Sequence, residues 1–130
     1  PEAIAALERS SQWPEHAEVP RARLLIGEAY RRSGKLNEAA ITFREVANQY
    51  WRLPVAPQAA LSAAETFLEA GKLPEAEAEF RHVLRDYLES PAAPRAQLGL
   101  GRVAFVAGKY AAARSAYQAA AVLFASAGIG

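Results

Sequence analysis

Apolar side chains recur along this chain at the spacing of amphipathic helices. One stripe has the i, i+4, i+7, i+8, i+11 order of a helix with a single buried face, and it comprises Ala39, Phe43, Val46, Ala47 and Tyr50. The same stripe returns further along as Ala76, Phe80, Val83, Leu84 and Tyr87. Mostly polar residues fill the positions between, so the pattern predicts helices that pack on one side and face water on the other.

The pattern repeats every 37 residues. A proline, a glycine and a large aromatic residue return at that interval: Pro20, Pro57, Pro94; Gly34, Gly71, Gly108; Phe43, Phe80, Tyr117. Each unit predicts two helices. The first begins at the proline, which suits the first helical turn, and ends at the glycine, which tolerates the left-handed conformation. The second begins near Asn37, Pro74 or Ala111.

The repeat divides the chain into a partial unit and three full ones. Residues 1–19 are predicted to be the second helix of a preceding repeat plus a loop, and the full repeats span 20–56, 57–93 and 94–130. Because the chain opens inside a unit, we expect it to be a slice of a longer array.

The units resemble the tetratricopeptide repeat. The first full unit carries Ile26-Gly27-x-x-Tyr30 in its first helix and Gly34-x-Leu36-x-x-Ala39-x-x-x-Phe43 across the turn. The second and third keep the turn motif, but Ala64 replaces the first glycine in one and Ala104 the tyrosine in the other. The resemblance implies an all-α, right-handed solenoid of antiparallel helix pairs with about seven helices.

The units are longer than the usual 34 residues because of the loops between repeats, at 50–57 and 87–94. These loops resemble those of a bacterial envelope variety, found in the periplasmic coordinator of the Tol-Pal system and in the outer-membrane assembly lipoprotein. The resemblance implies a periplasmic or envelope-associated protein in a bacterial multiprotein complex. Other bacterial repeat proteins share such loops, so a cytoplasmic location stays open.

Composition excludes several classes of function. The chain has 15 basic and 14 acidic residues and a net charge of +1, which does not favour nucleic-acid binding. It has no cysteine, which excludes disulfides, thiol catalysis and cysteine-bound metal. No run of about 18 apolar residues is present, so we expect no direct membrane insertion.

Candidate chemistry is scarce. The two histidines, His16 and His82, are isolated, and no phosphate-binding loop, metalloprotease motif or dinucleotide-binding glycine pattern is present. We therefore expect a non-catalytic protein without cofactor or metal.

In the family, the first helices line a concave groove that binds a peptide or protein segment. The resemblance places these residues in the groove: Arg21, Leu25, Glu28, Arg31 and Arg32; Gln58, Ser62, Glu65, Leu68 and Glu69; Arg95, Gly99, Arg102, Phe105 and Val106. The alternative is an ordinary solvated face of mixed charge. Some members of the family bind acidic C-termini through a carboxylate clamp, but of the matching positions only Arg95 keeps that chemistry, so we do not expect such recognition here.

The last predicted helix, from about Tyr110 to Ala127, has little polar surface. Its outward sides carry small or apolar residues: Ala112, Ala116, Ala119, Val122 and Ala125. A terminal helix of a solenoid normally has a polar outer face. Two explanations stay open: a further repeat covers this helix in a longer protein, or the helix is a surface for self-association or docking.

Overall fold

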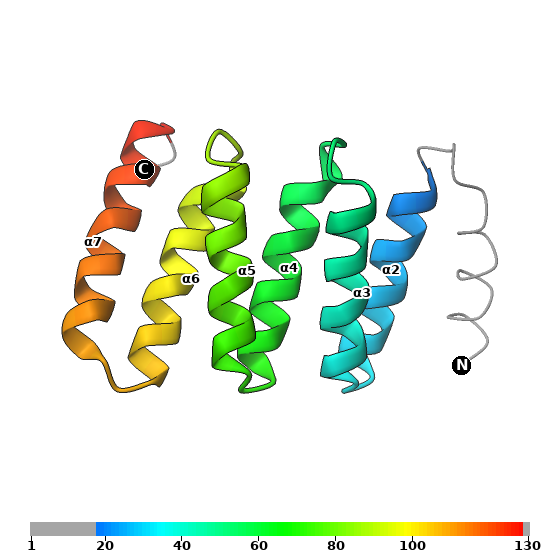
Figure 1. The fold of residues 1–130 in the computed structure, drawn as a ribbon, viewed down its shortest axis with the longest axis horizontal. Helices are drawn as coiled ribbons and strands as arrows, with labels where there is room; N and C mark the ends of the chain where they lie inside the picture. Colours follow the sequence, from blue (N-terminus) through cyan, green and yellow to red (C-terminus); the bar gives the residue numbers. More distant parts are fainter. Residues whose placement is uncertain (1–17, 129–130) are drawn as a thin grey trace.

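A computed structural model describes residues 18–128, and the helix predicted before residue 18 lies outside that range. The described part is a row of six helices (Figure 1). Their bounds are α2 Glu18–Arg32, α3 Leu36–Gln49, α4 Val55–Glu69, α5 Leu73–Asp86, α6 Ala92–Val106 and α7 Tyr110–Ser126. The predicted all-α repeat architecture is confirmed.

The first helix of each repeat begins two residues before the predicted proline, at Glu18, Val55 and Ala92. The predicted start was therefore wrong by half a turn. The backbone N–H groups of the first turn have no acceptor within the helix, so a proline at the third position loses no hydrogen bond.

The turns inside the repeats form as the glycines predict. Gly34, Gly71 and Gly108 have φ of 85°, 77° and 80°, a left-handed conformation that favours glycine. The lysine after each glycine donates its backbone N–H to the carbonyl five residues earlier, for example Lys35 N to Tyr30 O at 2.9 Å. This bond satisfies one of the last carbonyls of the helix and reverses the chain within a few residues.

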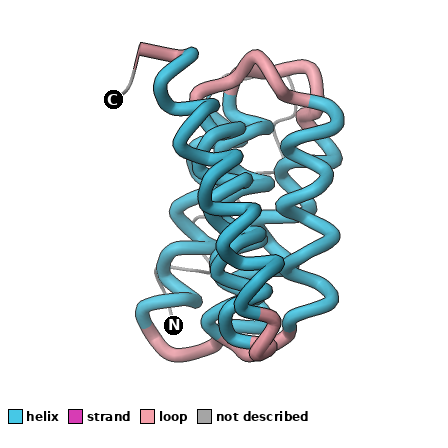
Figure 2. Tube along the Cα trace, turned by 90° about the vertical axis from the view of Figure 1, so that its left-hand side faces the viewer, coloured by secondary structure: helices cyan, strands magenta, loops and turns pink. Residues whose placement is uncertain are grey.

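The helices form two layers, and the loops gather at the two ends of the helices (Figure 2). Among the described residues, α2 contacts α4 and α4 contacts α6, whereas α3, α5 and α7 contact only first helices. The layer of α2, α4 and α6 is therefore the tighter one. A row of helices bends toward the layer that is closer packed, so this layer lines the concave side.

An aromatic wedge fills the space between helices in each repeat. Phe43 and Phe80 are 3% and 0% exposed, whereas Tyr117 in the last repeat is only half-buried. Each ring packs against a glycine of a first helix, because a larger residue there would overlap the ring. A Cβ atom added at Gly27 would lie 2.6 Å from the Phe43 ring, and one added at Gly101 would lie 2.4 Å from the Tyr117 ring.

Gly99 corrects one groove assignment. It is buried, and a Cβ atom there would lie 2.2 Å from Cε1 of Phe80, so Gly99 packs against α5 and does not line the groove. The cause lies in the second repeat. There Ala64 stands where the other repeats have Gly27 and Gly101, and its methyl group takes up space beside the wedge. We infer that Phe80 sits closer to α6 as a result, where only glycine fits.

Candidate binding groove

Charged side chains from two helices meet on the concave side. Arg31, at the end of α2, donates from Nε to Oε1 of Glu69 on α4 at 2.8 Å. Hydrogen bonding to Glu69 raises the pKa of Arg31. Both residues are predicted groove positions, and their ion pair links the first repeat to the second.

Glu65 lies where charges from all three first helices converge. Burial raises the pKa of its half-buried carboxyl group, and the positive charges of Arg102, Arg95 and Arg31, named in order of strength, oppose that effect. These arginines come from α6 and α2, on either side of Glu65 in α4. The predicted groove residues of the three repeats therefore share one electrostatic environment.

The two ends of the groove differ in how far their charges are paired. Near α2, Glu28 lies 3.5 Å from Nη1 of Arg31 and 3.3 Å from Nε of Arg32. On α6, neither Arg95 nor Arg102 forms a hydrogen bond or an ion pair with any residue in the described range. The α6 end therefore offers two guanidinium groups for a ligand, whereas the α2 end is largely neutralised by its own carboxylates.

A pocket of about 390 Å³ lies at the loop end of this face. Two predicted groove residues, Gln58 and Arg95, line it together with Pro54, Leu61, Ser90, Pro91, Ala92 and Phe124. The additional residues were missed by the sequence reasoning. The repeat could have indicated these residues, because the loop prolines recur at 54 and 91 and Phe124 is the equivalent of Tyr50 and Tyr87.

The remaining predicted groove residues are spread more widely. Those exposed at the surface are Arg21, Leu25, Gln58 and Val106. Ser62 is half-buried, and Leu68 packs against the hydrophobic core. Phe105 is exposed, but it contacts the Tyr110 ring of α7 at 5.2 Å between centroids and so lies at the C-terminal end of the row.

The residues predicted as an association surface on α7 are mostly exposed. Ala112, Ala119 and Val122 face solvent, with Val122 65% exposed. Ala116 is half-buried, because it lies toward α6 along with the buried Ala113 and Ala120.

The described residues offer no metal-binding group of three or more His, Asp or Glu side chains. His82 lies on α5 with Nε2 3.1 Å from Asp86 and Nδ1 3.5 Å from Glu79, so it belongs to a local polar cluster. His16 lies outside the described range. Among the described helices, none combines the length and apolar character needed to cross a bilayer.

A stack of helix pairs with a charged concave face defines the class of helical repeat scaffolds. The tetratricopeptide repeat family model matches residues 1–54, 24–87 and 61–128. The chain therefore belongs to the tetratricopeptide repeat family, whose members generally mediate protein–protein interactions and whose fold is a non-enzymatic scaffold. A search of curated proteins with this sequence found no match.

Proposed function

We propose that the concave face of α2, α4 and α6 binds an extended segment of a partner protein. The observation that carries this proposal is the convergence of Arg95, Arg102 and Arg31 on the half-buried Glu65. Such an arrangement places several charges on one concave surface, and charges arranged to complement a partner give specificity and register to a bound chain.

The chemistry of the α6 end indicates what the segment carries. Arg95 and Arg102 have no acceptor within the described range, and a guanidinium group binds a carboxylate through two parallel hydrogen bonds. Arg95 also lines the pocket beside the apolar side chains of Leu61 and Phe124. A segment with acidic residues and an apolar residue close by fits both features.

A paired charge reversal tests this function. Affinity capture with the full-length protein from its source cells identifies the bound protein, and calorimetry with the captured segment gives its affinity. Charge-assisted hydrogen bonds contribute about 1.5–3 kcal/mol each, so Arg95→Glu with Arg102→Glu should weaken binding by on the order of 100-fold or more and reduce its salt dependence.

The matched control reverses the same amount of charge outside the groove. Arg81 and Arg85 are exposed arginines on α5, and their replacement by glutamate should leave the affinity nearly unchanged. Undiminished binding by the groove variant, with helicity retained, would refute the groove proposal.

A second candidate function is self-association through the outer face of α7. Its support is the exposure of Ala112, Ala119 and Val122 on the last described helix. Sedimentation over a wide concentration range should then show a dimer that Val122→Glu dissociates. A monomer at every concentration would rule this function out.

The setting we propose is a bacterial envelope complex. The support is the likeness of the loops at 50–57 and 87–94 to those of periplasmic repeat proteins. Fractionation of source cells with an antibody against the full-length protein tests it, and recovery of the protein only from the cytoplasm would overturn it.

A further inference from the structure

A second hollow lies among the second helices, away from the concave groove. In the described part of the chain, α3 and α5 do not contact each other, because each packs on first helices only. Near their C-terminal ends they leave a pocket of about 800 Å³, and no residue of α2, α4 or α6 lines it. We call it the second-layer pocket, and its charged, polar and aromatic lining includes Asn48, Trp51, Arg52, His82, Arg85 and Asp86.

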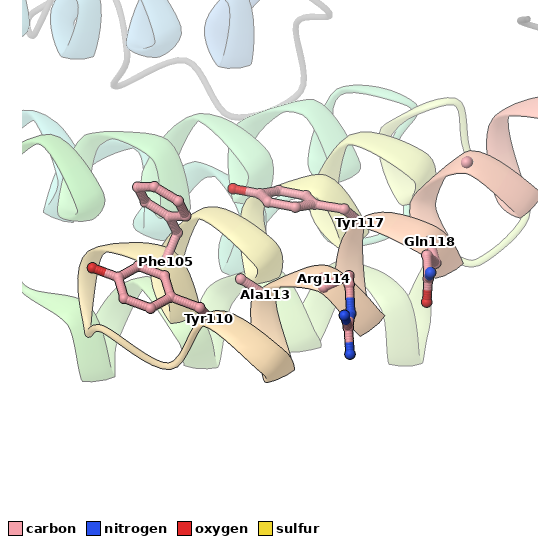
Figure 3. A pocket seen from close by; sticks show the side chains of 7 residues that line it. Phe105, Tyr110, Ala113, Arg114, Tyr117 and Gln118 are labelled. Atoms are coloured by element: carbon pink, nitrogen blue, oxygen red, sulfur yellow. The ribbon is translucent and has the colours of Figure 1, made fainter.

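The second-layer pocket lies inside the row of repeats, at a place that no repeat of this chain covers. Neither α3 and α5 nor α5 and α7 have a described helix packed across the gap between them on this side. The apolar pocket around Phe105, Tyr110 and Tyr117 is different (Figure 3), because it lies on the side of α7 that a following first helix covers in α3 and α5. A further repeat would close that apolar pocket and would leave the second-layer pocket open.

The lining of the second-layer pocket is not a requirement of the repeat. At the next junction, between α5 and α7, Leu88 and Glu89 stand at the positions of Trp51 and Arg52. The polar residues of α5 are replaced there by small or apolar ones, namely Ala119, Val122 and Leu123. Tryptophan, tyrosine and arginine are the residue types enriched at the hot spots of protein interfaces. Their concentration at a single junction therefore indicates a binding site.

Arg52 supplies the unpaired charge of this pocket. Its Cζ atom lies over the Trp51 ring, 4.6 Å from the ring centroid, where the negative face of the indole attracts a cation. No residue in the described range forms a hydrogen bond or an ion pair with Arg52. Arg85, in contrast, is neutralised by Asp86, with Nε 3.1 Å from Oδ1. The N–H groups of Arg52 are therefore available to bind a carboxylate through two parallel hydrogen bonds.

Hydrogen bonds to α5 fix the loop that carries Trp51 and Arg52. Tyr87, which also lines the pocket, donates its hydroxyl group to the backbone carbonyl of Trp51 at 3.0 Å. The Tyr87 ring lies 5.7 Å from the His82 ring between centroids, and Nε2 of His82 lies 3.1 Å from Oδ2 of Asp86. The Trp51 side chain itself is 55% exposed. The pocket thus combines an anchored wall with a large aromatic surface that is open to a ligand.

We propose that the second-layer pocket binds an acidic side chain of a partner protein together with an apolar residue next to it. The carboxylate pairs with Arg52, and the apolar side chain packs against Trp51 and Tyr87. Sites for small molecules enclose most of the ligand surface, whereas Trp51, Arg52 and Arg85 are all exposed. Such open walls cover one side of a bound group, which suits a side chain that a larger partner presents. The inference is independent of the groove proposal, because no groove residue lines this pocket.

Two peptides of the same shape test this assignment. Acetyl-Phe-Glu-Phe-amide carries a carboxylate between two apolar rings, and acetyl-Phe-Gln-Phe-amide differs only by the missing charge. The chain has two tryptophans, so in a Trp13→Phe background the fluorescence of Trp51 reports binding at this pocket. The titration extends to millimolar peptide, because a tripeptide buries little surface. The glutamate peptide should bind about 10-fold more tightly, since hydrogen bonds between charged groups are the stronger ones.

Substitution of Arg52 separates its charge from the folding of the chain. Arg52→Gln should bind both peptides equally, with unchanged helicity by circular dichroism. Arg44 provides the matched control, because its Cζ atom also lies over an aromatic ring, 5.4 Å from the centroid of Phe67, but outside the pocket. Arg44→Gln should keep the preference for the glutamate peptide. The groove variant Arg95→Glu with Arg102→Glu should keep it as well.

A photo-crosslinking residue at Asn48 tests the nature of the occupant in the full-length protein in its source cells. The expected product joins position 48 to another protein, at a segment with an acidic residue beside an apolar one, and Arg52→Gln should abolish it. A crosslink within the same polypeptide, or no crosslink, would overturn the assignment to a partner protein.

Three results with the isolated chain would also overturn the proposal. The first is the absence of binding by the glutamate peptide, and the second is equal binding of the two peptides by the unaltered chain. The third is a dimer in sedimentation that Arg52→Gln dissociates, which would make a second copy the occupant.

Discussion

The contact between Gly99 and Phe80 makes a quantitative prediction because Gly101, two residues away on α6, provides a matched control. A Cβ atom added at Gly99 would lie 2.2 Å from Cε1 of Phe80, and one added at Gly101 would lie 2.4 Å from Cε1 of Tyr117. Ordinary carbon contacts are about 3.5–4.0 Å, so each ring would have to retreat by more than about 1 Å. The two substitutions to alanine thus begin from nearly equal overlap.

The two rings differ in their freedom to retreat. Phe80 is fully buried between α4, α5 and α6, whereas Tyr117 is half-buried and lines an open pocket beside Phe105 and Tyr110. Overpacking a closed site costs about 1–3 kcal/mol. Alanine in place of a helical glycine contributes about 0.5–1 kcal/mol in the other direction at both sites. We therefore expect Gly99→Ala to be less stable than Gly101→Ala by about 1–3 kcal/mol.

Urea denaturation followed by circular dichroism measures both variants against the parent chain. Gly99→Ala should lower the free energy of unfolding by about 1–2 kcal/mol, and Gly101→Ala should leave it unchanged or raise it slightly. Equal stability of the two variants would refute the inference that the buried ring cannot move.

A second variant tests why Gly99 is required. If the methyl group of Ala64 displaces Phe80 toward α6, then Ala64→Gly should relieve the overlap in the Gly99→Ala chain. The double-mutant cycle should show a favourable coupling of about 1 kcal/mol between the two changes, and additive effects would show that Ala64 does not position the ring.

Three further outcomes follow from the geometry. Burial raises the pKa of Glu65, so the folded chain holds this proton more firmly than the unfolded chain. The associated stability is therefore fully present below the ordinary glutamate pKa and is lost as the pH rises through the folded-state pKa; Glu65→Gln should remove this pH dependence from the urea midpoint, and an unchanged profile would contradict it. Gly71 has φ of 77° with open space around it, so Gly71→Ala should cost about 1–2 kcal/mol through backbone strain alone, and a neutral result in urea would exclude that strain. The Tyr87 hydroxyl donates to the carbonyl of Trp51 at 3.0 Å, so Tyr87→Phe should cost about 0.5–1.5 kcal/mol, and a phenylalanine variant as stable as the parent would show that water replaces the bond.

The architecture could be predicted from the sequence because its determinants are local. The glycines at the turns impose a left-handed residue wherever they occur, and the apolar stripe of each second helix fixes which side is buried. The predicted starts of the first helices were two residues too late. The N–H groups of the first helical turn have no acceptor within the helix, so proline is tolerated at several positions there. Nothing in the sequence distinguishes the first helical position from the third.

The groove was predictable as a set of positions but not as a set of contacts. The repeat register placed Arg31, Glu65, Glu69, Arg95 and Arg102 on first helices, and the structure brings these residues into one electrostatic environment. Which charges form ion pairs depends on side-chain rotamers and on the distance between neighbouring helices. The repeat register of the sequence determines neither of these. Only the structure therefore shows that Glu69 neutralises Arg31, and that Arg95 has no acceptor in the described range.

The two surfaces of α7 show what a register adds to helical periodicity. The predicted outer face holds Ala112 and Ala119, and the equivalent residues of α3 are Glu38 and Glu45, which are also exposed. That face is therefore open to solvent in α3 as well, and only its composition changes in the last repeat. The side of α7 that carries Arg114 differs in exposure itself, because the exposed Arg114 stands where Ala40 of α3 is fully buried. Periodicity within one helix identifies which residues are outside, whereas comparison between repeats identifies which of them occupy a position that another helix covers elsewhere in the same chain.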